Sequence, residues 1–157
     1  MPNRGFTILE LVITVGIVSL LATAVLPSAQ LLYQRERERE LRASLRTLRA
    51  AIDAYKAAAD AGRIRKKVDQ SGYPPDLQTL VDGVEDARSA KEGVKVYFLR
   101  RVPRDPFWPD ATTPAAETWG LRSYASPPDD PQAGDDVYDV SSRSTRTGLN
   151  GVPYHDW

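Results

Sequence analysis

The stretch FTILELVITVGIVSLLATAVL, residues 6–26, decides the fold because its composition differs from that of the rest of the chain. Its only charged residue is Glu10, whereas the remainder of the chain is strongly hydrophilic. At 1.5 Å per residue, a helix of this length is roughly 31 Å long, close to the hydrocarbon thickness of a bilayer. We therefore expect residues 6–27 to form a membrane-spanning helix.

A short polar leader, MPNRG, precedes the apolar run. Its basic residue, Arg4, favours a cytoplasmic location for this end of the chain. The alternative is an ordinary secretory signal peptide cut after the small residues 22–24. Such a signal has an apolar core of only about 7 to 15 residues, and the run here is longer.

The junction between leader and apolar run, Gly5-Phe6-Thr7-Ile8-Leu9-Glu10, resembles the processing motif of type IV prepilins and of the pseudopilins of type II secretion. The match combines leader length, the Gly-Phe pair, the following Thr and a Glu four residues after Phe6. The resemblance implies that a membrane-embedded prepilin peptidase cuts between Gly5 and Phe6. It also implies N-methylation of Phe6.

Glu10 needs a partner if it lies in an apolar environment, because an unpaired carboxylate there costs several kcal/mol. No basic residue lies between Phe6 and Gln34. The best candidate is the α-amino group that cleavage would create at Phe6. The resemblance favours pairing of that amine with Glu10 of a neighbouring subunit, which would set the stagger of a filament; the alternative is a hydrated Glu10 near the membrane boundary.

A second helical segment is expected from residue 28 to about residue 62. Pro27 should kink or locally unwind the helix between the two segments, or simply mark the end of the apolar run. Apolar residues then recur at spacings of 4, 3, 4, 3 and 4, which places them on one side of a helix that needs a cover. They are Leu41, Leu45, Leu48, Ile52, Tyr55 and Ala59.

The run from Arg35 to Glu40 alternates in charge. This pattern suits a solvated, ion-paired helix surface, which we favour, or contacts between subunits.

Residues 63–157 are expected to form a small globular domain, because this part of the chain holds most of the Pro and Gly residues. Asp76 is a suitable N-cap for a short helix whose apolar face includes Leu77 and Leu80. Three short runs predict about three antiparallel strands, which should pack on the striped helix. The runs are 94–99, 121–125 and 137–141. The expected fold class is α+β: a long N-terminal helix, half transmembrane and half amphipathic, packed on a small antiparallel sheet, as in pilins.

The whole chain is similar to the major pseudopilin of type II secretion, the G subunit. Segments 72–80, 97–107 and 137–142 carry this narrower resemblance. It implies a single-pass protein of the bacterial inner membrane with a cytoplasmic N-terminus and a periplasmic domain. It also implies a homopolymeric filament that drives protein export. The implied partners are membrane lipid before assembly, minor pseudopilins, the prepilin peptidase, and an inner-membrane assembly platform with its ATPase.

One departure concerns calcium. Members of that family usually end in an Asp-rich calcium-binding loop, but residues 142–151 here contain two Arg and no Asp. A calcium ion needs about 6 to 8 oxygen ligands, so the remaining candidates, Asp139, Ser142 and Asp156, make a weak site. The loop is expected to be ordered instead by hydrogen bonds and by packing of Tyr154 and Trp157, or the chain belongs to a divergent branch with a different filament.

The composition argues against other functions. Equal numbers of basic and acidic residues, 21 each, give no reason to expect a nucleic-acid partner. A single histidine, His155, and no cysteine leave little for catalysis, so we expect a structural protein with no required cofactor. The acidic residues at 129, 130, 135 and 136 are expected to form a solvated turn. The alternatives are a type IV pilin of a surface filament for adhesion, motility or DNA uptake, and a membrane-anchored binding domain.

Overall fold

The computed structural model describes residues 5–157, apart from the side chains of residues 23–28. The chain divides into two compact units, Met1–Glu36 and Arg37–Trp157. Helix α1, Ile8–Asp60, begins in the first unit and ends in the second. Helix α1 is continuous through residue 27, so the local unwinding predicted at Pro27 is absent from the described backbone. In the part of the chain that the structure describes, no helix is both long and apolar enough to cross a bilayer.

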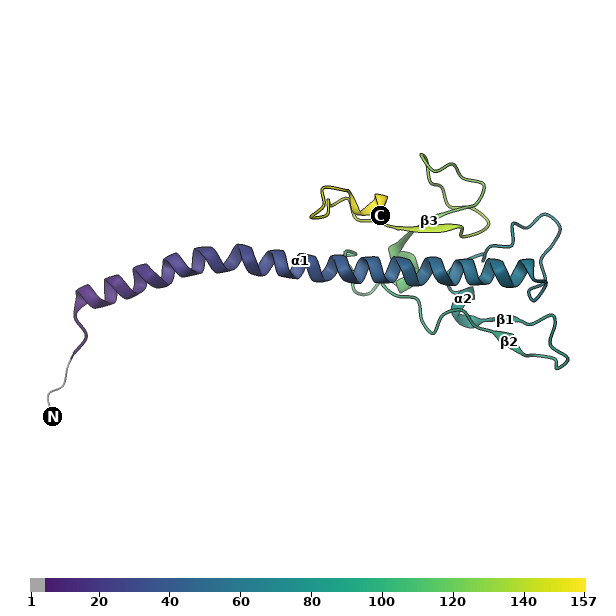
Figure 1. Ribbon diagram of the computed structural model, residues 1–157, viewed down its shortest axis with the longest axis horizontal. Helices are drawn as coiled ribbons and strands as arrows, with labels where there is room; N and C mark the ends of the chain where they lie inside the picture. Colours follow the sequence, from purple (N-terminus) through teal and green to yellow (C-terminus); the bar gives the residue numbers. More distant parts are fainter. Residues whose placement is uncertain (1–4) are drawn as a thin grey trace. The chain divides into compact units, whose positions relative to one another are not determined.

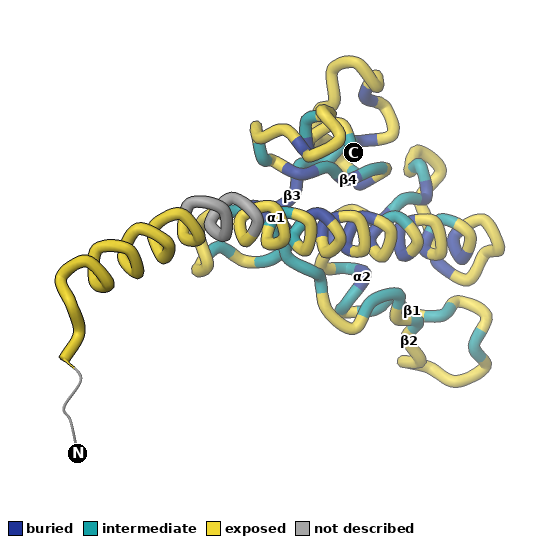
Figure 2. Tube along the Cα trace, turned by 60° about the vertical axis from the view of Figure 1, so that its left-hand side comes forward, coloured by how far each residue is buried: buried dark blue, intermediate teal, exposed yellow. Residues whose placement is uncertain are grey.

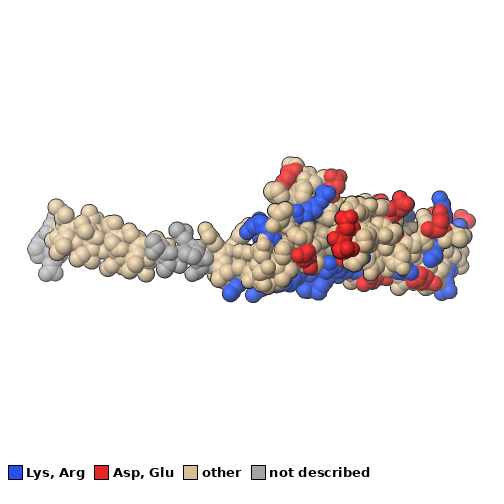
Figure 3. Space-filling view, turned by 90° about the horizontal axis from the view of Figure 1, so that it is seen from above, with Lys and Arg blue, Asp and Glu red and all other residues tan. Residues whose placement is uncertain are grey.

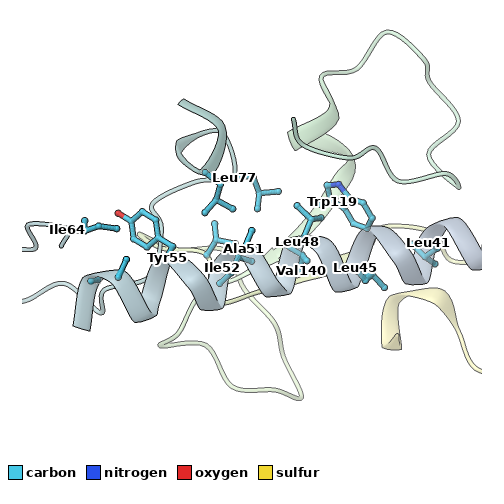
Figure 4. Close-up of a cluster of buried hydrophobic side chains, with 14 of the residues drawn as sticks. Leu41, Leu45, Leu48, Ala51, Ile52, Tyr55, Ile64, Leu77, Trp119 and Val140 are labelled. Atoms are coloured by element: carbon cyan, nitrogen blue, oxygen red, sulfur yellow. The ribbon is translucent and has the colours of Figure 1, made fainter. Parts of the chain in front are cut away.

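The predicted apolar stripe on α1 is buried in the core of the second unit. Leu41, Leu48 and Ile52 are fully buried, and Tyr55 and Ala59 are nearly so. Figure 2 shows the buried positions recurring along this part of α1, and Figure 4 shows the side chains gathered between the helix and its neighbours. The 3.6-residue period of the helix therefore places these residues as the sequence predicts.

Two small antiparallel sheets, together with the short helix α2 (Thr79–Asp82), surround this part of α1 (Figure 1). In one sheet, β1 (Val84–Glu85) pairs with β2 (Lys95–Val96); in the other, β3 (Trp119–Arg122) pairs with β4 (Asp139–Ser142). Trp119 on β3 and Val140 on β4 join the same apolar core as the α1 stripe. Two short 3-10 helices, η1 (Ala115–Thr118) and η2 (Tyr154–Asp156), complete the described elements. The α+β class with a long N-terminal helix is confirmed.

The strand prediction was wrong in number and grouping, because four short strands form two separate sheets. The run predicted over residues 94–99 is a strand only at Lys95–Val96. Beyond it, the N–H groups of Phe98 and Leu99 donate to the carbonyl oxygen of Leu80, at 3.0 and 2.9 Å. Those donors are therefore unavailable to a sheet, and the chain turns toward α2 instead.

Helix α2, Thr79–Asp82, lies where the sequence predicts a short helix. The carboxylate of Asp76 accepts hydrogen bonds from the N–H of Thr79 at 2.7 Å and from its hydroxyl at 2.8 Å. Asp76 thus satisfies a helix N–H that has no intrahelical partner, although the N-cap position itself is held by Gln78 and not, as predicted, by Asp76. Leu77 and Leu80 are both buried and anchor this short helix on the core.

Candidate functional site: the amino-terminal segment and the carboxyl-terminal lock

The predicted processing site lies immediately before helix α1. Gly5, Phe6 and Thr7 are outside the helix, which begins at Ile8. Phe6 is 76% exposed. A Cβ atom at Gly5 would meet no atom within 4 Å, and Gly5 has no positive φ, so the fold does not require glycine at this position. Any requirement for glycine there must come from recognition by another molecule.

Thr7 and Glu10 together start the helix, which the sequence analysis did not anticipate. The hydroxyl oxygen of Thr7 accepts a hydrogen bond from the N–H of Glu10 at 3.2 Å. The pattern Thr-x-x-Glu is that of a capping box, in which the first residue caps the helix and the Glu lies three positions later. The carboxylate of Glu10 also lies in the first turn, where the helix dipole favours negative charge.

The apolar segment that follows is not covered by any other part of its own unit that the structure describes. Every residue from 5 to 22 is exposed, including eleven large apolar side chains between Phe6 and Leu21. Soluble monomers rarely expose a contiguous apolar surface of more than a few hundred Å², because burial of such surface is strongly favourable. This segment therefore requires an apolar partner outside its own chain.

A separate set of contacts, the carboxyl-terminal lock, fastens the end of the second unit to α1. Glu38, only 3% exposed, accepts hydrogen bonds from the hydroxyl of Tyr154 at 3.0 Å and from the N–H of Leu149 at 2.7 Å. Arg42 lies 3.5 Å from the Glu38 carboxylate and 4.2 Å above the centre of the Trp157 ring. The prediction that residues 35–40 are a solvated surface was therefore wrong for Glu38.

Arg49 provides the second half of the lock. Its Nε donates to the carboxylate of Asp139 at 2.7 Å. Its Nη2 donates to the main-chain oxygens of Val140 at 3.1 Å and Trp157 at 2.8 Å. A planar guanidinium can reach several acceptors at once, so one side chain connects α1, β4 and the last residue of the chain.

Aromatic packing completes the lock. Tyr154 is fully buried and stacks on Phe107 with ring centres 4.0 Å apart. Trp157 meets the edge of Tyr154 at 5.0 Å. The prediction that hydrogen bonds and the packing of Tyr154 and Trp157 order this loop is confirmed.

The three weak calcium candidates are not brought together. Asp139 is paired with Arg49, the hydroxyl of Ser142 donates to the buried carboxylate of Asp105 at 2.6 Å, and Asp156 lies 3.3 Å from His155. Among the described residues, no group of three or more acidic, His or Cys side chains could hold a metal ion.

The acidic segment before β4 is only partly a solvated turn. Asp129, Asp130 and Asp135 are exposed as predicted, but Asp136 is partly buried. It accepts hydrogen bonds from the hydroxyls of Ser71 and Ser123 and from the N–H of Tyr124. Burial raises the pKa of Asp136, but these hydrogen bonds together outweigh it and hold the pKa below its usual value.

Comparison with known proteins identifies the amino-terminal segment. Residues 1–26 match the prokaryotic N-terminal methylation motif. This motif is typical of type IV pilin-like proteins, a structural class that includes pseudopilins and pilus subunits and whose members are processed by a prepilin peptidase. Neither the curated proteins nor the solved structures gave a match. The chain thus carries a type IV pilin-like amino terminus.

Proposed function

We propose that this protein is a pseudopilin, a structural subunit that polymerises into a short periplasmic filament of a type II secretion system. The observation that carries the proposal is the exposed apolar segment of residues 6–21, which has a single carboxylate, Glu10, and lies within the stretch that matches the methylation motif, residues 1–26. Such a segment needs a cover, and lipid before assembly and neighbouring subunits after it would both supply one.

In this proposal Phe6 and Glu10 direct assembly. Cleavage after Gly5 creates an amine at Phe6, and pairing of this amine with Glu10 of the next subunit would neutralise the carboxylate in the filament core. The hydrogen bond between Glu10 and Thr7 uses the main-chain N–H of Glu10. The Glu10 carboxylate is not part of this bond and would be available to the amine. The proposal places the filament in the bacterial inner membrane, with the second unit in the periplasm. Minor pseudopilins and an assembly platform with its ATPase are the partners of this role.

The carboxyl-terminal lock supports a domain that is ordered by its own side chains. Glu38 and Arg49 bind the last residues of the chain through hydrogen bonds, and the calcium candidates Asp139 and Ser142 are engaged by Arg49 and Asp105. We therefore propose no calcium requirement for the secretion function of this chain. Addition of a chelator should leave the melting temperature of the purified protein unchanged, whereas a fall on chelation would restore calcium as a structural ligand.

The experiment that tests the proposal is N-terminal sequencing and intact-mass measurement of the protein from membranes of its native host. The expected chain begins at Phe6, and its mass exceeds that of the unmodified residues 6–157 by one methyl group. Filaments or crosslinked multimers should be lost in Glu10→Val, whereas Thr14→Val, a neighbouring polar-to-apolar change in the same segment, should retain them. An intact Met1, or a chain that starts after Ala24, would contradict the proposal.

The phenotype of the host separates secretion from the role of a surface pilin. A secretion subunit is required for the appearance of folded proteins in the medium and leaves no long fibres outside the cell. Long extracellular fibres with unchanged secretion would instead assign the chain to a surface pilus.

A further inference from the structure

A groove on the second unit is lined on one side by α1 and on the other by the end of the chain. Its volume is about 380 Å³. Three arginines, Arg42, Arg46 and Arg49, follow one another at spacings of 4 and 3 residues, which puts them on the same side of the helix. The remaining lining residues are Leu45, Asn150, Val152, Asp156 and Trp157. We call this feature the arginine groove.

The charges in the arginine groove are not fully balanced. Arg42 lies beside Glu38, and Arg49 is paired with Asp139. Arg46 lies between them in the sequence, is exposed, and has no ion pair or side-chain hydrogen bond with any residue that the structure describes. Asp156 also lines the groove, but its carboxylate lies 3.3 Å from His155. The groove therefore offers one available guanidinium, that of Arg46, and Trp157 lines the same groove.

The loop between β3 and β4 presents the opposite charge. Residues 127–135 read PPDDPQAGD and contain no basic residue. Their base is fixed, because the N–H of Ser123 donates to the Gln132 carbonyl at 2.9 Å and the N–H of Gln132 donates to the Ser126 hydroxyl at 2.7 Å. Three prolines restrict the backbone further. Figure 1 shows this connection, in yellow-green, projecting beyond the strands. We call it the acidic loop.

The geometry points to a contact between two copies of this chain, in which the acidic loop of one subunit docks in the arginine groove of the next. Asp129 and Asp130 would supply carboxylates to Arg46, and the prolines beside them would pack on Trp157. Because the loop is already ordered, docking loses little conformational entropy. This inference rests on the proposed filament function and names a surface that would hold neighbouring subunits together.

Two observations favour this pairing over others. The loop and the groove are different surfaces of one chain, so the contact can repeat head-to-tail, with the loop of each subunit in the groove of the next, as an open helical filament requires. Another group of basic residues, Arg65, Lys66 and Lys67, borders a hollow that Asp135 and Asp136 of the same chain already line. On the face that Figure 3 shows, acidic and basic side chains are interspersed over the second unit. A local match is therefore needed for specificity.

The test uses the full chain in its native host, with multimers captured by formaldehyde. Arg46→Glu and the pair Asp129→Lys with Asp130→Lys should each lower the yield of multimers about tenfold, and the combination of all three changes should restore most of it. Arg65→Glu is the matched control, since it reverses an exposed arginine outside the groove and should leave the yield unchanged. Because the chain has no cysteine, a second measurement is direct: Arg46→Cys and Asp130→Cys, expressed together on separate copies, should form a disulfide-linked dimer.

The outcomes separate this inference from the proposed function. The docking contact would be overturned if multimers depend on Glu10 but not on the charge reversals, and if no disulfide forms between the Arg46→Cys and Asp130→Cys copies. The filament proposal would still stand in that case. The absence of any multimer from the unaltered chain would overturn both. Restoration by the combined variant, together with the disulfide-linked dimer, would establish the contact even if a single variant lowered folding yield.

Discussion

The hydroxyl of Tyr154 donates a hydrogen bond to Oε1 of Glu38 at 3.0 Å, joining residues that are 116 positions apart in the sequence. Glu38 is otherwise a carboxylate buried on the inner side of α1, and Tyr154 is a fully buried ring. The pair therefore fixes the end of the chain to the helix and satisfies two polar groups that would be costly to bury alone.

Loss of this hydrogen bond should destabilise the protein. Tyr154→Phe keeps the ring stacked on Phe107 but removes one donor from a buried carboxylate, so the free energy of unfolding should fall by about 1 to 3 kcal/mol. Urea unfolding of the full chain in detergent measures the change. Tyr97→Phe, an exposed tyrosine, serves as the control and should stay within about 0.5 kcal/mol of the unaltered protein. Equal stability of Tyr154→Phe and the unaltered protein would show that the bond contributes nothing.

Arg49 should not be replaceable by lysine. Its guanidinium donates to three acceptors at once, on Asp139, Val140 and Trp157. A lysine keeps the charge but has no planar fork, so Arg49→Lys should cost about 1 to 2 kcal/mol and increase protease cleavage after residue 142. Arg46→Lys, on the next turn of the same helix, is the control. If both variants resist proteolysis equally, the lock does not depend on the geometry of the guanidinium.

The sequence predicts those features of the fold whose pattern lies within a short stretch of residues, and it predicts contacts between distant residues less well. The α1 stripe from Leu41 to Ala59 is correctly predicted because helical period alone determines which residues share a face. Glu38 continues that stripe three residues before Leu41, so its burial could have been inferred from spacing. Its charge suggested a surface residue instead, because the compensating partner, Tyr154, is far away in the sequence.

The sheets were predicted less well for a related reason. Strands of two residues, such as β1 and β2, are too short to show an alternating pattern. Whether Phe98 continues a strand or donates to Leu80 is decided by tertiary packing, which no short window of sequence reports. At the amino terminus, by contrast, the motif is contiguous, so Gly5, Phe6 and Glu10 could be proposed directly, while the capping role of Thr7 was missed although the Thr-x-x-Glu pattern was present.

Asp110 should titrate at unusually low pH. The N–H and hydroxyl of Thr112 and the hydroxyl of Thr113 donate to its carboxylate and lower its pKa to about 2. A carboxyl whose pKa is lower in the folded state adds stability above its ordinary pKa of 3.8, and this contribution is lost as the pH falls toward 2. NMR titration of the side-chain carboxyl carbon should give a midpoint near 2. A midpoint near 3.8 would show that these hydrogen bonds are absent in solution.

Asp136 should hold the base of the acidic loop. Its carboxylate accepts hydrogen bonds from Ser71, Ser123 and Tyr124, so Asp136→Ala should lower the free energy of unfolding by about 1 to 3 kcal/mol. Asp129→Ala removes an exposed carboxylate from the same loop and should change stability by less than about 0.5 kcal/mol. Hydrogen exchange at the Tyr124 amide reports the effect locally. Unchanged exchange in Asp136→Ala would contradict the assigned role.

Residue 10 contributes to the start of α1 through its main-chain N–H, and its carboxylate is proposed to act in assembly. Glu10→Gln removes the negative charge but keeps a residue that suits the third helical position of a capping box. Thr7→Ala keeps the charge but removes the oxygen that accepts the hydrogen bond from the Glu10 N–H. If pairing of Glu10 with the Phe6 amine directs assembly, Glu10→Gln should lose most multimers after normal processing, and Thr7→Ala should retain them with a helix start weakened by about 1 kcal/mol. Crosslinking measures the first effect and the amide exchange of residues 8–11 the second. The reverse pattern, in which Thr7→Ala abolishes multimers and Glu10→Gln does not, would overturn the proposed role of the Glu10 carboxylate, because only the main-chain hydrogen bond to Thr7 would then matter for assembly.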